Sequence, residues 1–128
     1  MTQTDFTIDC TGDVVTGDVI EFSESVFSGS HRRPQYLGDR LVQARVLRDS
    51  YGPDRQQHTF TILILASSGV QALVQGAQTT RKGRNVYRHG TRRQPWHDEA
   101  ARRQTAAEKH ARGDLARATR DERRAAGR

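Results

Sequence analysis

The sequence predicts a mainly β (α+β) protein: a small, partly closed β-barrel or curled antiparallel sheet, followed by an exposed basic C-terminal α-helix. Large apolar residues (Val, Ile, Leu, Phe, Met and Trp) number 23 in residues 1–79 and three in residues 80–128. Three Gly-Asp pairs, each before an apolar run, punctuate the first part with turns. Because only this part can close a hydrophobic core, one small domain with an appendage is expected.

Three stretches of the apolar part are predicted strands: residues 17–27, 39–50 and 55–66. The clearest is 55–66, in which apolar residues alternate and then occupy both faces, as in a central buried strand. Residues 39–50 are also compatible with a helix, because Leu, Gln, Ala and Arg all tolerate one. The turn sequence "SYGPDR" at 50–55 predicts that the last two strands form a hairpin.

The remainder of the chain divides into two segments after a β-rich core domain at residues 1–79. Residues 80–96 are predicted to be a basic strand or linker, in which "NVYRHG" forms a last short strand. Residues 97–128 are predicted to be a basic helical tail rich in Ala and Arg, with Asp98 and Glu99 at its positive end. The tail has no apolar stripe, so we expect it to project into solvent.

Charge is distributed as unevenly as hydrophobicity. Residues 1–79 carry a formal charge of −3 and residues 80–128 carry +9, which together give the net charge of +6. Such asymmetry points to a polyanionic partner. The alternative is that the acidic start and the basic end of the chain attract each other.

The basic segment and one loop supply the candidate nucleic-acid-binding residues. Arginine and lysine neutralise phosphates, and arginine presents a planar fork to phosphate oxygens. The candidates are Arg81, Lys82, Arg84, Arg88, Arg92, Arg93, Arg102 and Arg103, with Arg32 and Arg33 in the loop 30–36 and with Tyr87 and Trp96 as stacking platforms. Both aromatic residues favour RNA over DNA, because they can stack on unpaired bases. Trp96 is equally suited to pin the helix start, and Tyr87 to a half-buried position.

No residue is predicted to be catalytic, and no cofactor or metal is expected. Cys10 is the only cysteine, which excludes an intramolecular disulfide and a cysteine-cluster zinc site. The five histidines lack the spacing of a metal pair. A metal-free ribonuclease using His58, His31 and either Arg32 or Arg33 is the third hypothesis, since such chemistry needs only a base, an acid and a cation.

The leading hypothesis is a small cytoplasmic accessory protein that binds nucleic acid. The N-terminus has no secretory signal, and the longest apolar run, "ILILA", is too short to cross a bilayer, so no membrane association is expected. The second hypothesis is a non-enzymatic protein-interaction or phage accessory factor, which contacts a protein partner or a second copy of itself.

The stretches "GDVIEFSESVF", "GDRLVQARVLRDSYGPDRQQHTFTILIL" and "RKGRNVYRHGTRRQPW" cover most of the chain. They are similar to small basic proteins of actinobacteria and their phages, a group that implies no particular activity. Strands opened by "GD" more distantly resemble the small RNA-binding barrels of the PUA and ASCH type. The basic signature motif of the ASCH group is not evident, so that resemblance transfers no site residue.

Overall fold

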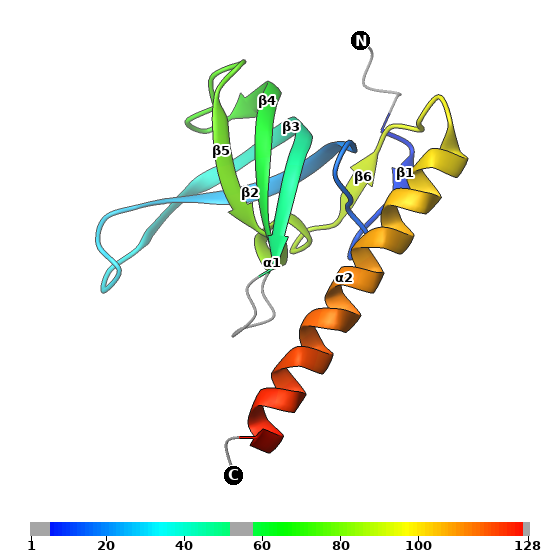
Figure 1. Cartoon of the computed structure of the whole chain (residues 1–128). Helices are drawn as coiled ribbons and strands as arrows, with labels where there is room; N and C mark the ends of the chain where they lie inside the picture. The colour runs from blue at the N-terminus through cyan, green and yellow to red at the C-terminus, as the bar shows by residue number, and fades with distance from the viewer. Residues whose placement is uncertain (1–5, 52–57, 127–128) are drawn as a thin grey trace.

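The computed structural model describes residues 6–51 and 58–126, with side chains described for residues 6–50 and 59–112. This part of the chain forms one antiparallel sheet and two helices (Figure 1). The elements are β1 (Ile8–Asp9), β2 (Val19–Ser28), β3 (Gln35–Tyr51), β4 (His58–Gly69), β5 (Gln78–Lys82), α1 (Gly83–Val86), β6 (Thr91–Arg93) and α2 (Glu99–Ala126). Among these residues, no helix combines the length and apolar composition that a membrane crossing requires.

The sheet is curled and open, so the prediction of a partly closed barrel is wrong and its alternative, a curled sheet, holds. Its strand order is β1-β6-β2-β3-β4-β5, and no pairing joins β1 to β5 within the described strands. Register irregularities in the β3–β4 pair lie between Gln43 and Ala44 and between Val46 and Arg48. Such irregularities bend a strand and increase its twist. The edge strand β1 has two residues, which is too short to carry the curl to closure.

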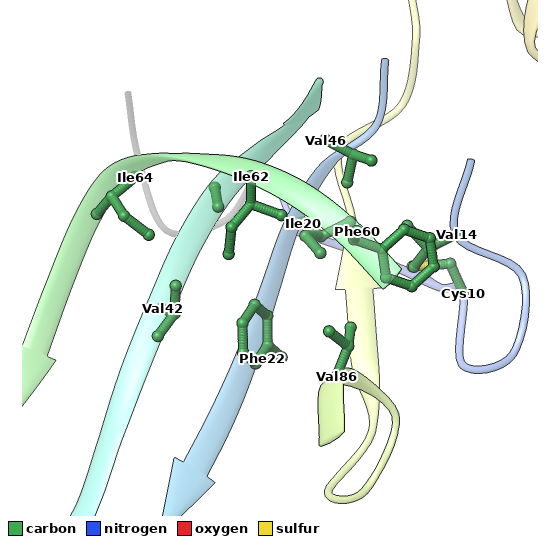
Figure 2. Packing of buried hydrophobic residues seen from close by; sticks show 11 residues of the cluster. Cys10, Val14, Ile20, Phe22, Val42, Val46, Phe60, Ile62, Ile64 and Val86 are labelled. Atoms are coloured by element: carbon green, nitrogen blue, oxygen red, sulfur yellow. The ribbon is translucent and has the colours of Figure 1, made fainter. Parts of the chain in front are cut away.

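The core lies on the concave face of the sheet (Figure 2). Alternate residues of the three longest strands are buried there, as the apolar patterns at 17–27 and 55–66 predicted, and 39–50 is a strand rather than a helix. The buried strand residues are Ile20, Phe22 and Val26, then Val42, Ala44 and Val46, and then Phe60, Ile62 and Ile64. The predicted hairpin pairing of β3 with β4 is confirmed, while residues 52–57 of its turn lie outside the described residues.

The segment "NVYRHG" is not a strand as predicted but contains the end of α1 and the turn after it. The Tyr87 N–H donates to the Gly83 carbonyl at 2.9 Å, which closes the single helical turn. Val86 is fully buried and caps the core, which is why the chain turns inward here. The last strand is β6, which lies between β1 and β2. The sequence analysis ended the β-rich core domain at residue 79, and this predicted boundary lies inside β5.

The prediction of an exposed helix is wrong for the first turns of α2. Arg102 and Lys109 are 6% and 8% exposed, while Thr105 and Ala106 between them are half-buried. These four residues follow the i, i+3, i+4, i+7 spacing of a docking face. The helix therefore has a buried stripe of the kind that docking requires, but the first and last residues of the stripe, Arg102 and Lys109, are cationic rather than apolar.

Candidate nucleic-acid interface

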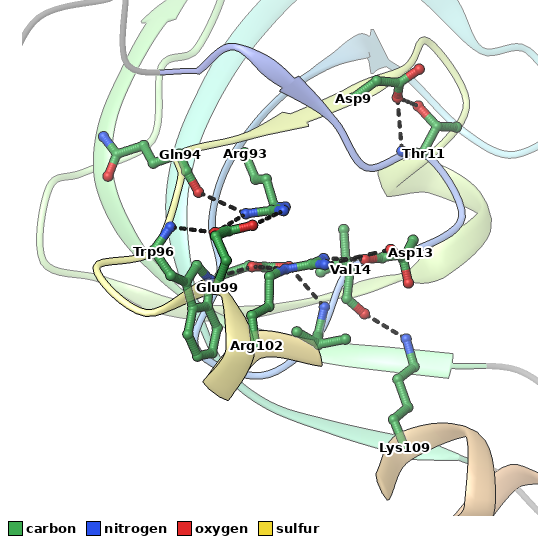
Figure 3. A network of polar contacts seen from close by, with 12 residues as sticks. Asp9, Thr11, Asp13, Val14, Arg93, Gln94, Trp96, Glu99, Arg102 and Lys109 are labelled. Carbon is green, nitrogen blue, oxygen red and sulfur yellow. Dashed lines mark hydrogen bonds and ion pairs between the residues drawn. The ribbon is translucent and has the colours of Figure 1, made fainter. Parts of the chain in front are cut away.

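Two candidate residues, Trp96 and Arg102, lie close together where the chain enters α2 (Figure 3). The buried carboxylate of Asp18 holds both. The side chain of Asp18 has no exposed surface and accepts the Trp96 Nε1–H at 2.7 Å. It also accepts the Nε–H and an Nη2–H of Arg102, each at 2.9 Å. Hydrogen bonds from this arginine to Asp18 raise the pKa of the Arg102 guanidinium. Both side chains therefore fasten the start of α2 to the loop before β2.

Lys109 adds a second attachment point along the same helix. Its Nζ donates to the Val14 carbonyl and lies 3.9 Å from the carboxylate of Asp49 and 5.4 Å from the ring centre of Phe60. Burial lowers the pKa of Lys109, and the charge of Asp49 opposes part of that effect. A cation placed so deeply has no surface left for a phosphate.

Arg93 forms an ion pair with Glu99 where the chain enters α2. Its Nη1 and Nη2 donate to the two carboxylate oxygens of Glu99 at 3.0 and 2.8 Å, and the Trp96 N–H donates to the same carboxylate at 2.7 Å. These hydrogen bonds, the Arg93 pair first, lower the pKa of Glu99 to about 2. Asp98 caps the helix, because its Oδ1 accepts the N–H groups of Ala100 and Ala101.

Arg81 and Tyr87 also make contacts within the protein. Arg81 binds both carboxylate oxygens of Glu24, at 2.8 and 3.1 Å, and Arg40 donates to the same group at 2.6 Å. The hydroxyl of Tyr87 accepts the Val14 N–H, and its ring meets the edge of Phe60. Tyr87 is therefore half-buried, which is the alternative that the sequence analysis gave to a role in base stacking.

The other seven candidate residues are exposed: Arg32, Arg33, Lys82, Arg84, Arg88, Arg92 and Arg103. Arg92 lies opposite Asp9 across the β1–β6 pair, where hydrogen bonds from Thr11 and then the charge of Arg92 lower the pKa of Asp9. For the other six, the described part of the chain supplies no ion pair. Arg32 and Arg33 lie at the tip of the β2–β3 hairpin, which projects from the sheet (Figure 1).

A groove of about 270 Å³ opens between β2 and the α1 turn, and we name it the β2–α1 groove. Its lining residues are Glu24, Ser25 and Phe27 of β2, Arg40 of β3, Arg81 of β5, and Asn85, Arg88 and His89 of α1 and its turn. Within the described residues, Asn85, Arg88 and His89 have no hydrogen-bond partner. This wall of the groove therefore offers free donors beside the triad of Glu24 with two arginines.

Two exposed aromatic rings pack against each other where β2 and β3 approach their hairpin turn. Phe27 and Tyr36 are 54% and 56% exposed, and their ring centres are 5.7 Å apart. Val26 and Phe27 are adjacent, so burial of Val26 in a strand places Phe27 on the other face.

The residues of the ribonuclease hypothesis are not brought together in the described structure. His58 begins β4, and its side chain lies outside the described side chains. His31 is exposed in the hairpin tip. No cluster of three or more His, Cys, Asp or Glu side chains suitable for a metal occurs among the residues described.

Comparison with known proteins identifies the family and corrects the expected kinship. Residues 10–96 match the family described as Domain of unknown function (DUF7699). Zinc finger CCCH domain-containing protein 62 of Oryza sativa subsp. japonica is 40% identical over an alignment of 121 residues, and the match covers 91% of this chain and 17% of that protein. The chain therefore spans about a sixth of the length of this relative. No solved structure matches the chain.

The predicted kinship with proteins of actinobacteria and their phages is therefore wrong, since the matches are this family and a plant protein. The matched residues contain all of the sheet except β1 and stop before α2. With one cysteine, this chain cannot itself contain a CCCH finger. It belongs to the DUF7699 family.

Proposed function

We propose that this protein binds nucleic acid through the exposed cations around α1. The expected preference for RNA rested on Tyr87 and Trp96, which make contacts within the protein, so the proposal covers RNA and DNA alike. The observation that carries the proposal is the set of exposed basic side chains that have no ion-pair partner among the described residues. Lys82, Arg84 and Arg88 are exposed and lie within seven residues of one another, and Arg88 lines the β2–α1 groove. Five other candidates are used inside the protein, so the proposed interface is narrower than the whole basic segment.

Phosphate binding is the chemistry that these side chains suit. Each neutralised phosphate releases condensed counterions, so affinity falls with salt concentration. The planar guanidinium of arginine can donate two hydrogen bonds to one phosphate. The acidic groups near α1 do not cancel this charge, because Glu24 is already shared by Arg40 and Arg81.

An accessory role is proposed by analogy with the Oryza sativa protein, in which the matched region is about a sixth of the length. The Oryza sativa protein is named for a CCCH zinc finger, and the region similar to this chain is 121 residues of it. We propose that such a region adds a binding surface to a polypeptide that carries another domain. A cytoplasmic location remains a prediction.

A salt titration with matched variants tests the proposal. RNA and DNA oligonucleotides are titrated with wild type, with Arg84→Gln/Arg88→Gln, and with the control Arg45→Gln/Arg48→Gln. Arg45 and Arg48 are exposed arginines of β3 that do not line the groove. Loss of two phosphate contacts should make the slope of log K against log salt less negative by about 1.8 on duplex DNA, or about 1.4 on single strands.

The control pair should leave that slope unchanged. Equal changes in both variants would show that the whole cationic surface acts without a defined interface. Absence of binding by wild type, or binding that ignores salt, would reject the proposal and favour the protein-partner alternative.

A further inference from the structure

We infer that the tip of the β2–β3 hairpin, residues 26–37, binds an unpaired strand of nucleic acid. The bases stack on the rings of Phe27 and Tyr36, and the phosphates bind Arg32 and Arg33. This inference rests on the proposed function and gives it a substrate class, single-stranded RNA or DNA. The hairpin tip is a contact of its own, separate from the cations around α1.

The two rings lie together on the convex face of the sheet, opposite the core. Phe27 and Tyr36 are cross-strand partners in the β2–β3 pair, and the buried neighbour of Phe27, Val26, points to the concave face. The next pair on the same face is Ser25 with Asp39, whose side chains are joined by a hydrogen bond. Since both rings are more than half exposed, a base can lie against either of them without displacing a described part of the chain.

The ring pair is held in place before any ligand binds. The rings pack at an angle of 59°, and the Tyr36 hydroxyl donates to Asp39 Oδ1 at 2.7 Å. The Ser25 hydroxyl donates to the same oxygen at 3.2 Å. Because these contacts restrict the rings, stacking a base on them costs little conformational entropy. Every base has a π-face, so such a platform accepts any sequence.

The turn beyond the rings carries the cations that a phosphate backbone needs. Residues 26–37 contain two arginines and no aspartate or glutamate. Arg32 and Arg33 are exposed and have no ion-pair partner among the described residues. The Arg33 N–H donates to the Ser30 carbonyl at 3.1 Å, which closes the turn and places both arginines at the end of the projecting hairpin (Figure 1).

The spacing of rings and cations suits one short stretch of a strand. Arg33 and Tyr36 are three residues apart, which is no more than about 11 Å of chain. A stacked strand rises about 3.4 Å per nucleotide, so about three nucleotides cover this length. We therefore expect the same strand to reach the ring pair and the arginines.

The exposed area of the ring pair favours bases over a protein partner. An aromatic side chain buries about 150–250 Å² when it is enclosed, so two rings that are each about half covered offer about 150–250 Å² together. A stable protein interface needs about 800 Å² from each partner. Leu37 beside the rings, 42% exposed, does not close this gap. A duplex is a poor ligand for the rings, because its bases stack on one another and leave no free face.

Fluorescence anisotropy with labelled 12-mers of single-stranded RNA, single-stranded DNA and duplex DNA tests the inference. Phe27→Ala should weaken the binding of single strands about 5- to 150-fold and leave duplex binding unchanged. Phe27→Leu keeps apolar bulk without an aromatic face and should reproduce the loss, whereas Phe27→Trp keeps an aromatic face and should retain the wild-type affinity. The control Val74→Ala shortens an apolar residue outside the hairpin (74% exposed) and should change neither.

The phosphate contacts are tested by Arg32→Gln/Arg33→Gln. Loss of both arginines should make the slope of log K against log salt less negative by about 1.4 on single strands. A loss confined to one of the two single strands would identify that nucleic acid as the ligand of the hairpin.

Two results would overturn the inference while leaving the proposed function intact. The first is equal wild-type affinity for single strands and duplex. The second is unchanged single-strand binding by Phe27→Ala and Phe27→Leu, which would leave the ring pair to a protein partner. If wild type bound none of the three nucleic acids, the proposed function itself would fail.

Discussion

Replacement of Asp18 by Asn should be among the most destabilising single polar substitutions in this chain. Asp18 accepts hydrogen bonds from the Val15 N–H, from the indole of Trp96 and from two nitrogens of Arg102. The amide keeps the shape but removes the negative charge and turns one acceptor into a donor. Arg102, 6% exposed, is then a buried cation beside a neutral group.

The expected magnitude follows from the burial of both partners. Removing one member of a buried ion pair costs about 3–5 kcal/mol. For a domain of this size, that corresponds to a fall in Tm on the order of 10–20 °C. Asp13→Asn is the matched control, because the carboxylate of Asp13 is 51% exposed and lies 3.5 Å from Arg102. An exposed pair of this kind contributes less than about 1 kcal/mol.

Thermal and urea unfolding, followed by fluorescence of the single tryptophan, measure both variants. A double-mutant cycle with Arg102→Met separates the pair from the single effects, and the double variant should be less destabilised than the sum of the singles by 0.5–3 kcal/mol, roughly. Similar small losses for Asp18→Asn and Asp13→Asn would refute the reasoning, because they would show that α2 does not depend on the buried carboxylate.

Three further predictions concern stability. Gly17→Ala should cost about 1–3 kcal/mol in urea unfolding, because the new Cβ would lie 2.9 Å from the indole ring at a φ of +98°, whereas Gly76→Ala at φ +88° in open space should cost only about 1 kcal/mol. The pKa of Glu99 is depressed in the folded protein, so the stability that this group contributes is complete above its unfolded pKa of about 4.3 and is lost as pH falls towards about 2. Glu99→Gln should therefore flatten this part of a plot of Tm against pH. An unchanged plot would contradict the role given to the Arg93–Glu99 pair. A chain ending at Arg112 should unfold as cooperatively as the full chain. Deletion of residues 97–128 should abolish or strongly weaken the unfolding transition. Equal Tm values for the two truncated chains would contradict docking of α2.

The strands were predictable because their cause is local. Alternation of apolar residues at Ile20 and Phe22, and again at Phe60, Ile62 and Ile64, reports directly which face is buried. Closure of a sheet depends on strand length and register across the whole fold, which no local pattern encodes. The sequence therefore predicted two alternatives, a partly closed barrel and a curled sheet, and could not decide between them.

The docking of α2 was missed for a different reason. An apolar stripe is the usual signal for a helix that packs on a core, and Arg102 and Lys109 do not produce one. Their spacing of seven residues was visible, but its meaning depended on Asp18 and Val14, which are 84 and 95 residues away along the chain. Partners so distant cannot be identified from composition.

The sequence could not tell which of the candidate cations are free. Basic residues were easy to find in the sequence, but whether a cation is free depends on where the acids lie in the fold. Arg81 and Arg88 look alike in sequence, yet Glu24 binds the first and the second has no ion-pair partner among the described residues.

The span of the Asp18 contacts sets the order in which the molecule can be completed during synthesis. Residues near the start of the chain pair with β6 and with Arg102, so they must wait until nearly all of the sheet has left the ribosome. Contacts of such long sequence separation slow folding, since a large loop must close before they form. Until then, the carboxylate of Asp18 is exposed to water. The nascent chain has an incomplete sheet, in which β1 still lacks its partner strand β6.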